Sequence, residues 1–187
     1  MNKLLQIDKQ LFQVINGRWN NDFLDTLLPF LRNSNFWYPL YLFLLLFAFA
    51  NISKNKGWWL FFAAGTVILS NFLSSDLIKE NIYRLRPCND ADLADSIRVL
   101  VTYRPQSSSF TSSHAVNHFA MAAFFYGTLK KYMGKRAYLF FVWAISICYA
   151  QVYVGVHFPL DVICGGLIGL VLGYLSARAY NNNYQQV

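Results

Sequence analysis

Long apolar stretches constrain this chain more than any other feature of its sequence. Four of them occupy residues 57–78, 113–129, 137–156 and 160–180, and each is close to the roughly 20 residues that a helix needs to cross a bilayer. A fifth, 36–50, is equally apolar but must borrow flanking residues to span. Backbone amides cannot stay unpaired in lipid, so such stretches form helices. The sequence therefore predicts an all-α, polytopic membrane bundle of five transmembrane helices.

Composition agrees with this prediction and excludes several other classes of protein. Of the 187 residues, 56% are hydrophobic and only 13% are charged, about half the charged share of typical soluble chains. The mean hydropathy of +0.30 requires polar segments between the apolar ones. This balance excludes a disordered chain, a collagen-like repeat and a nucleic-acid-binding tail, so no nucleic-acid partner is expected. Three cysteines, two of them in apolar stretches, predict no disulfide framework.

Residues 1–34 differ from the rest of the chain. Apolar and polar residues alternate in the first half of this region as in an amphipathic helix, and the apolar segment that follows is too short to span. The region lacks the pattern of a cleaved signal peptide. We therefore expect a single membrane domain, 1–187, with an amphipathic, interfacial region 1–34 and a transmembrane bundle over 36–180.

Basic residues in the short loops predict how the bundle is oriented. The loops 51–56 and 130–136 are rich in lysine, and Arg178 follows the last apolar stretch, which places these three sites on the cytoplasmic side. The segment 79–112 and the turn 156–160 then share the exoplasmic face. The N-terminal region is also basic, although five spans would place it outside. A sixth crossing within 1–34 would remove this conflict, and the sequence leaves both topologies open.

Ionisable residues gather at the predicted exoplasmic face. All three histidines, His114, His118 and His157, lie at or just inside the ends of apolar stretches on that face. Ionisable groups at membrane depth are costly and generally face a polar cavity. The same face carries Asp76, Lys79, Arg84, Arg86, Arg104 and Asp161. Cations, imidazoles and carboxylates at one end of a bundle indicate an anion-binding site.

Three local patterns refine this prediction. In the segment Lys79 to Pro87, one lysine and two arginines close an apolar stretch, and arginine binds phosphate oxygens through its planar fork. A run of Ser and Thr from Ser107 leads to His114 at the start of an apolar helix, where free backbone N–H groups attract anions. In the turn between the last two stretches, His157 precedes Asp161 by four residues. A carboxylate so placed can orient one ring nitrogen and leave the other as a nucleophile or base.

The order of these patterns resembles a known family. Lys-x6-Arg-Pro, a Ser-His helix start and Gly-x-His-x3-Asp, over residues 79–161, are similar to the type 2 phosphatidic acid phosphatase and vanadium haloperoxidase superfamily. The several spans favour its membrane lipid phosphatase branch. The resemblance implies metal-independent phosphoryl transfer through a phosphohistidine, with no cofactor and no bound metal, on a segment 79–112 that forms an exoplasmic active-site loop. It also implies an integral protein of a bacterial inner membrane with its active site on the exoplasmic, periplasmic face.

The resemblance implies a role for each matching residue. His157 corresponds to the nucleophile, Asp161 to the carboxylate that orients it, and His114 to the acid that protonates the leaving group. Phosphate binding would fall to Lys79, Arg86, Ser112 and Ser113.

Two positions depart from the family pattern. The second motif usually reads Pro-Ser-Gly-His, whereas this chain has Thr, Ser, Ser and His at 111–114. The third motif usually opens with Ser-Arg, whereas this chain has Ala150 and Gln151. The missing arginine would remove one cation from the phosphate cage. Arg84 and Arg104 are candidate auxiliary cations, and Gln151 could donate hydrogen bonds without supplying charge.

Several alternatives remain open from the sequence. The substrate could be phosphatidic acid, phosphatidylglycerol phosphate, a polyprenyl pyrophosphate or lipid A, because each has a tail in the bilayer and a phosphate at its surface. A family member that binds lipid phosphates without efficient turnover is the alternative to an enzyme. A zinc site at His114 and His118 is disfavoured by the surrounding cations, and a carrier by the absence of an obvious internal repeat. The sequence does not specify an oligomeric state.

Overall fold

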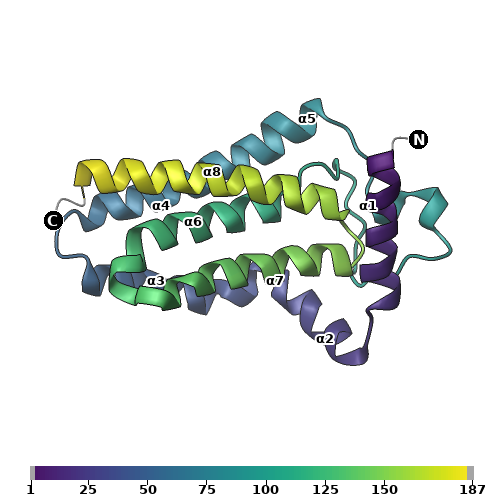
Figure 1. Cartoon of the computed structure of the whole chain (residues 1–187), viewed down its shortest axis with the longest axis horizontal. Coiled ribbons are helices and arrows are strands. Elements are labelled where there is room, and N and C mark those ends of the chain that lie inside the picture. Colours follow the sequence, from purple (N-terminus) through teal and green to yellow (C-terminus); the bar gives the residue numbers. More distant parts are fainter. Residues whose placement is uncertain (1–2, 185–187) are drawn as a thin grey trace.

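The computed structural model describes residues 3–184, and within this range the secondary structure is helical, without strands. The bundle consists of long helices that lie side by side (Figure 1). They are α3 (Tyr38–Asn51), α4 (Lys56–Asn71), α6 (Ser113–Met133), α7 (Leu139–Tyr153) and α8 (Pro159–Tyr184). Helix α4 continues through a π-helical segment, Phe72–Ile78, into the short α5, Lys79–Asn81. Each predicted apolar stretch thus coincides with one long helix, and the all-helical prediction is confirmed.

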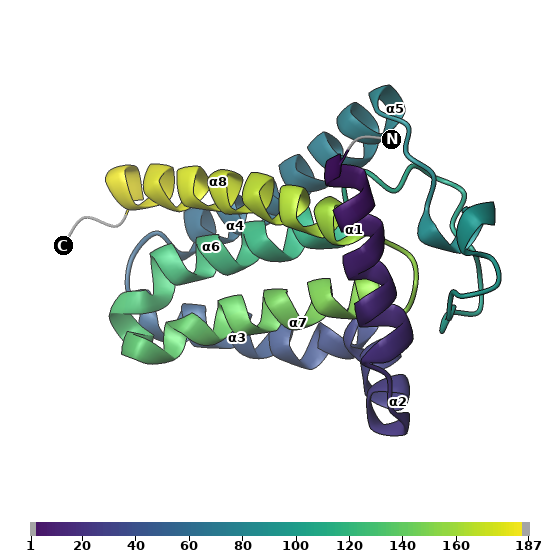
Figure 2. The ribbon, with the colours of Figure 1, turned by 45° about the vertical axis from the view of Figure 1, so that its right-hand side comes forward.

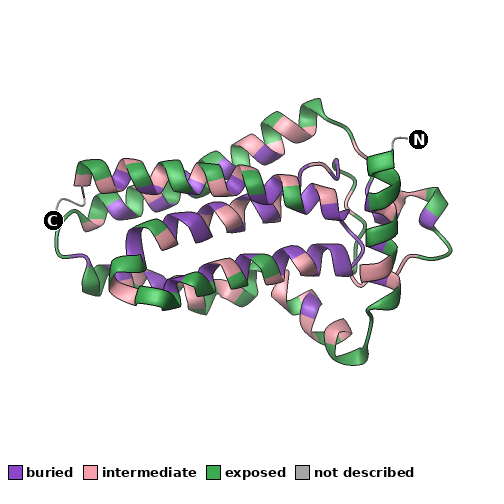
Figure 3. Ribbon diagram, in the orientation of Figure 1, coloured by how far each residue is buried: buried purple, intermediate pink, exposed green. Residues whose placement is uncertain are grey.

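Two continuous helices, Lys56–Asn81 and Pro159–Tyr184, are long and apolar enough to cross a membrane. Exposed residues lie along the outer sides of the helices (Figure 3), and many of them have large apolar side chains. Examples from four different helices are Leu46, Ile68, Val142 and Val171, each more than half exposed. A soluble monomer rarely exposes so continuous an apolar surface, whereas a bundle in lipid requires one.

The N-terminal region crosses one end of the bundle. Helix α1 (Lys3–Gln13) runs across this end and continues through a π-helical turn, Val14–Arg18, toward α2 (Asp22–Leu31) (Figures 1 and 2). Its leucines and isoleucine are largely exposed, while Asp8 and Phe12 are buried. The Phe12 ring packs edge-on against Phe158, with 5.4 Å between the ring centroids. The structure therefore places α1 over the turn that precedes α8.

The connections differ between the two ends of the bundle. The short connections 52–55 and 134–138 lie at the end farther from α1, together with the end of α8 (Figure 1). The segment 82–112 and the turn 154–158 lie at the end that α1 crosses (Figure 2). The lysine-rich loops and the predicted site are thus at opposite ends.

Small residues allow α6 and α8 to pack closely. A Cβ atom added at Gly173 would lie 2.1 Å from the Ala120 carbonyl oxygen, and one at Gly169 would lie 2.3 Å from that of Val116. Glycine is therefore required at both positions if the two backbones are to approach this closely. This contact matters for the site because α6 begins at Ser113 and α8 begins just after His157.

Candidate active site

The predicted site residues come together at the end of the bundle that α1 crosses. The turn 154–158, the first turns of α6 and α8, and the irregular segment 82–112 converge there. Gly155 shapes the turn, since its φ of +88° is a left-handed conformation and an added Cβ would lie 2.6 Å from the Arg98 carbonyl oxygen. The backbone therefore positions His157 two residues after a glycine that no larger residue can replace without strain.

The His157 imidazole has a defined contact at each ring nitrogen. Its Nδ1 lies 3.4 Å from the Ser109 hydroxyl, and that hydroxyl donates a 2.5 Å hydrogen bond to Asp161 Oδ2. The direct separation of Nδ1 from Asp161 Oδ2 is 3.6 Å, longer than a hydrogen bond. Nε2 lies 3.1 Å from Arg86 Nη1, which can only donate. The arrangement therefore favours the proton on Nδ1 and a free lone pair on Nε2, the form that a nucleophile requires.

Burial also keeps His157 uncharged. The side chain is 2% exposed, and removal from water lowers the pKa of His157 to about 4, although the nearby Asp161 carboxylate opposes this shift. At neutral pH the ring is therefore neutral in the unliganded protein.

The Asp161 carboxylate is fully buried and fully engaged. Oδ2 accepts from the Ser109 hydroxyl and from the Phe158 amide at 2.9 Å, and Oδ1 accepts from Arg84 at 2.6 Å. Its place in the first turn of α8 adds the favourable field of the helix N-terminus. These interactions stabilise the ionised carboxylate and hold it beside the imidazole.

Arg86 is held rigidly against His157. Its Nε donates to the Ser107 carbonyl at 2.8 Å, Nη2 donates to the Ser107 hydroxyl at 3.0 Å, and Nη1 donates to the Val156 carbonyl at 3.1 Å. Burial lowers the pKa of Arg86 from its ordinary value, but an arginine remains charged at neutral pH. A fixed cation thus lies directly beside the Nε2 lone pair.

Lys79 is a second cation at this site. It lies half-buried on α5, and its charge interacts with those of Arg86 and Asp161. Among the described residues, no carboxylate forms an ion pair with it. A partly buried ammonium without a carboxylate partner is suited to an anionic ligand.

The start of α6 contributes backbone donors. The buried Ser112 caps the helix, with its hydroxyl accepting from the Ala115 amide at 3.4 Å, and its own amide donates to the Asp161 carbonyl at 3.2 Å. The Ser113 hydroxyl contacts Ser75 at 3.1 Å. First-turn amides have no acceptor within their own helix, so the amides of Ser113 and His114, rather than that of Ser112, remain for an anion.

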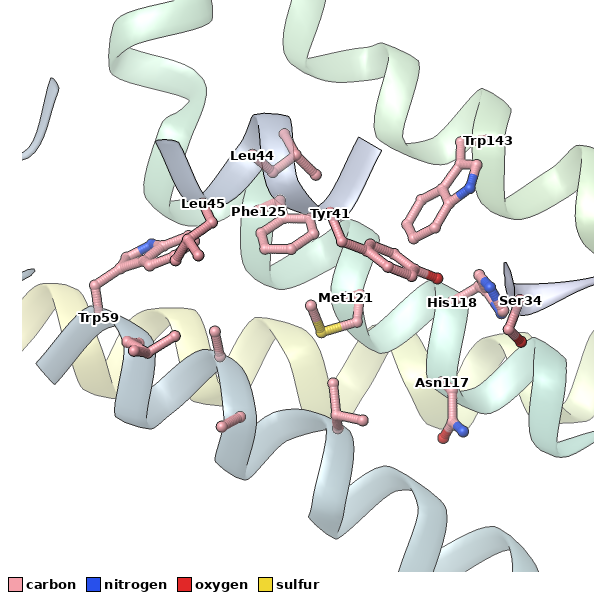
Figure 4. A pocket seen from close by; sticks show the side chains of 14 residues that line it. Ser34, Tyr41, Leu44, Leu45, Trp59, Asn117, His118, Met121, Phe125 and Trp143 are labelled. Carbon is pink, nitrogen blue, oxygen red and sulfur yellow. The ribbon is translucent and has the colours of Figure 1, made fainter. Parts of the chain in front are cut away.

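His114 lines a cavity of about 550 Å³ that opens at this end of the bundle. Arg32, Ser34 and Tyr103 line it as well. A second cavity, of about 490 Å³, lies between α3, α4, α6 and α7, and its lining is largely apolar (Figure 4). Ser34 lines both cavities, so a polar and an apolar cavity adjoin beside His114.

His118 lies one turn further along α6 than His114 and lines the apolar cavity near Trp143 (Figure 4). Its Nδ1 lies 2.8 Å from the His114 carbonyl oxygen, and its ring packs edge-on against Trp143. Over residues 3–184 no group of three or more His, Cys, Asp or Glu side chains is arranged to hold a metal ion. His118 therefore serves in helix packing and in the cavity wall.

The two arginines predicted as auxiliary cations, Arg84 and Arg104, bind other groups of the protein. Arg84 bridges two carboxylates, Asp161 at 2.6 Å and Asp8 at 2.5 Å. Arg104 is exposed and donates to the Cys88 carbonyl at 2.8 Å. Gln151 is fully buried, and its Oε1 lies 3.5 Å from Arg32 Nε. The cation nearest to Gln151 therefore comes from the N-terminal region.

Sequence reasoning missed three residues of this site: Asp8, Arg32 and Ser109. Ser109 belongs to the run of Ser and Thr before α6, and no sequence spacing distinguishes it from the other residues of that run. Asp8 and Arg32 lie in the region interpreted as interfacial, far from the motifs in sequence. A charged residue on the apolar side of an amphipathic helix, as Asp8 is, was the only available signal.

The helical bundle thus holds a buried imidazole beside a carboxylate, with cations around both, an arrangement suited to an anionic ligand. The profile of the PAP2 superfamily matches residues 56–185, and the chain belongs to this superfamily. It is accordingly a phosphatase, a hydrolase of phosphate esters, which confirms the resemblance seen in the sequence.

Three individual proteins, two of them with solved structures, are similar to this chain. The chain is 26% identical to the lipid A 4'-phosphatase of Porphyromonas gingivalis over 96% of its own length and 75% of that protein. The crystal structure of Aquifex aeolicus LpxE matches with a TM-score of 0.63 and 27% identity, covering 92% of this chain and 95% of that one. A transmembrane PAP2-type phosphatidylglycerolphosphate phosphatase from Bacillus subtilis shares the fold, with a TM-score of 0.71 and 23% identity over 97% of this chain and 88% of its own.

Proposed function

We propose that this protein is an integral-membrane phosphatase that removes a terminal phosphate from a lipid through a phosphohistidine at His157. The observation that carries the proposal is the arrangement around this ring, in which Nδ1 faces Ser109 and Asp161 and Nε2 faces Arg86. A neutral imidazole with Nε2 free and a fixed cation beside it is set up to attack phosphorus.

The reaction has two steps. The Nε2 lone pair attacks phosphorus in line, the bond from phosphorus to the ester oxygen breaks, and His114 as imidazolium gives its proton to the departing oxygen. A water then attacks the phosphohistidine while His114 accepts its proton, which releases inorganic phosphate and restores Nε2. Lys79, Arg86 and the first amides of α6 stabilise the charge on the equatorial oxygens. No step requires a metal ion.

A lipid substrate is supported by the two adjoining cavities. A phosphate held between His157 and His114 would leave the cavity that His114 lines, and the adjoining apolar cavity that begins at the next turn of α6, for the rest of the lipid. The apolar exterior of the bundle supports a membrane protein of five spans, with α1 and α2 as the interfacial region 1–34. Segment 79–112 then forms the active-site loop on the exoplasmic face of a bacterial inner membrane, opposite the lysine-rich loops.

The relatives indicate which lipid to test first. A lipid A 4'-phosphatase is related over nearly the whole chain, so a lipid A phosphate is the first candidate. A protein that binds lipid phosphates without turnover is disfavoured here, because the chain retains the predicted nucleophile beside its carboxylate, with the predicted acid close enough to interact electrostatically with the nucleophile.

Phosphate release by the purified protein in detergent tests this proposal. We would assay lipid A, phosphatidylglycerol phosphate, phosphatidic acid and undecaprenyl pyrophosphate, each in EDTA, with His157→Ala alongside. We expect release from at least one lipid that persists in EDTA and disappears in the variant. Activity that EDTA abolishes, or that survives in His157→Ala, would contradict the mechanism. A folded protein that releases phosphate from none of the four would favour a binding protein.

A further inference from the structure

The cations at the site end of the bundle fall into two groups. One group is neutralised by carboxylates: Arg84 pairs with Asp8 and Asp161, Arg98 pairs with Asp25, and Lys9 pairs with Asp90 and Asp92. The other group has no carboxylate partner within the described range. It contains Lys79 and Arg86, which the proposed mechanism uses, the exposed Arg18 and Arg104, and the half-buried Arg32, which the mechanism does not use.

Arg32 is directed toward the site rather than toward solvent. It ends α2, where it is half-buried, and its guanidinium lies 6.0 Å from the centroid of the Tyr103 ring. Its Nε lies 3.5 Å from Gln151 Oε1. It lines the same cavity as His114. Its positive charge lies close enough to interact electrostatically with both His114 and Arg86. The guanidinium thus faces the side of the site where the leaving group would depart.

Gln151 provides an independent sign of a ligand at this place. Its side chain is fully buried, yet its Nε2 has no hydrogen-bond partner among residues 3–184. An unsatisfied buried donor is costly, and its own Oε1 lies next to Arg32. An anionic oxygen would be bound by the Gln151 amide and the Arg32 guanidinium together.

We infer that Arg32, delivered from the N-terminal region, is a third phosphate-binding cation, and that it works with Gln151 at the position where the family pattern places an arginine. The inference rests on the proposed function and deepens it. Arg32 binds the transferred phosphate on the side of His114. Because the Arg32 guanidinium and the Gln151 carboxamide lie side by side, a variant that carries the positive charge at residue 151 instead of residue 32 should still bind the phosphate.

Kinetics of three variants test this directly, with the lipid substrate found active for the wild type. Arg32→Ala should lower kcat/KM by tenfold to about a hundredfold, as expected for the loss of a charge-assisted contact. The double variant Arg32→Ala/Gln151→Arg should recover to within about tenfold of the wild type. Arg18→Ala removes the same charge from an exposed position nearby and serves as the matched control, with activity unchanged.

Orthovanadate, which mimics a phosphate in its transition state, supplies a readout that does not depend on turnover. It should raise the unfolding temperature of the wild type and of Arg18→Ala, with a much smaller rise for Arg32→Ala. The inference is overturned if Arg32→Ala matches Arg18→Ala in kcat/KM and in vanadate response, or if adding Gln151→Arg to Arg32→Ala restores neither. Vanadate binding that needs Arg32, in a protein without activity on any lipid, would support the inference and refute the proposed turnover. The absence of both activity and vanadate response would overturn both.

Discussion

At the scale of single residues, the site depends on a serine between the histidine and the carboxylate. The Ser109 hydroxyl can donate to Asp161 and accept from His157 Nδ1 at the same time, and it is fully buried. The carboxylate is too far from the imidazole for a direct hydrogen bond. Orientation of His157, the proposed nucleophile, is therefore shared by Ser109 and Asp161.

Removal of this hydroxyl should slow the reaction. We expect Ser109→Ala to lower kcat by tenfold to about a hundredfold, because a hydrogen bond to a charged group contributes about 1.5–3 kcal/mol. Steady-state phosphate release measures the effect. Ser146→Ala is the control, since within residues 3–184 that hydroxyl bonds only to the Trp143 carbonyl of its own helix. Equal kcat values for the two variants would show that Asp161 orients His157 without the serine.

The protonation of His157 can be observed directly. Burial lowers its pKa to about 4, so we expect the ring to remain neutral on titration from pH 7.5 down to about 4.5. Spectra of ¹⁵N-histidine-labelled protein in detergent measure this, with His157→Asn identifying the signal. An unfolded histidine titrates near pH 6.5, so folded stability should fall between about pH 6.5 and 4 as the unfolded chain takes up the proton. A midpoint near 6.5 in the folded protein would contradict the burial argument.

At the scale of elements, the close contact of α6 with α8 sets the distance between the predicted acid and the nucleophile. His114 lies at the start of α6 and His157 just before α8, and glycines of α8 face carbonyl groups of α6. A larger residue at the contact would separate the helices and alter the site as well as the packing.

Gly173→Ala tests this contact. The added methyl group would lie 2.1 Å from the Ala120 carbonyl oxygen, and overpacking of this kind costs about 1–3 kcal/mol. We expect a lower unfolding temperature in detergent, together with reduced phosphate release. Gly65→Ala is the matched control because no atom lies within 4 Å of its added Cβ, and alanine there should be neutral or mildly stabilising. Equal unfolding temperatures would show that the helices can separate freely.

At the scale of the whole molecule, the N-terminal region is part of the site. Asp8 of α1 accepts from Arg84 at 2.5 Å and from the Leu160 amide at 2.8 Å. Asn16 donates to the Arg98 and Tyr153 carbonyls, each at 2.7 Å. These contacts tie α1 and the π-helical turn after it to segment 82–112, to α7 and to the start of α8, so the side of α1 that carries Asp8 faces the protein rather than solvent.

Asp8→Ala should therefore weaken both the fold and the site. It leaves the Leu160 amide and one side of Arg84 unpaired, at a cost of about 2 kcal/mol, which corresponds to an unfolding temperature about 5 °C lower. Thermal unfolding in detergent measures the stability, and phosphate release measures the site. Asp22→Ala, an exposed residue at the start of α2, is the control and should leave both unchanged. A variant at Asp8 that matched this control would show that α1 is not held by its carboxylate.

The sequence by itself determined the helical class, the positions of the long helices and the residues that match the family. These features are local, because apolar length predicts a helix in lipid and the motifs have fixed spacing. Only the tertiary structure showed that Ser109 stands between His157 and Asp161, that Arg84 is neutralised, and that Arg32 lies against Gln151. These contacts join residues that are 48 to 119 positions apart in the sequence, and those of Asp8 and Arg32 depend on how α1 and α2 pack across the bundle. Periodicity and spacing describe one element at a time, so they carry no information about such contacts.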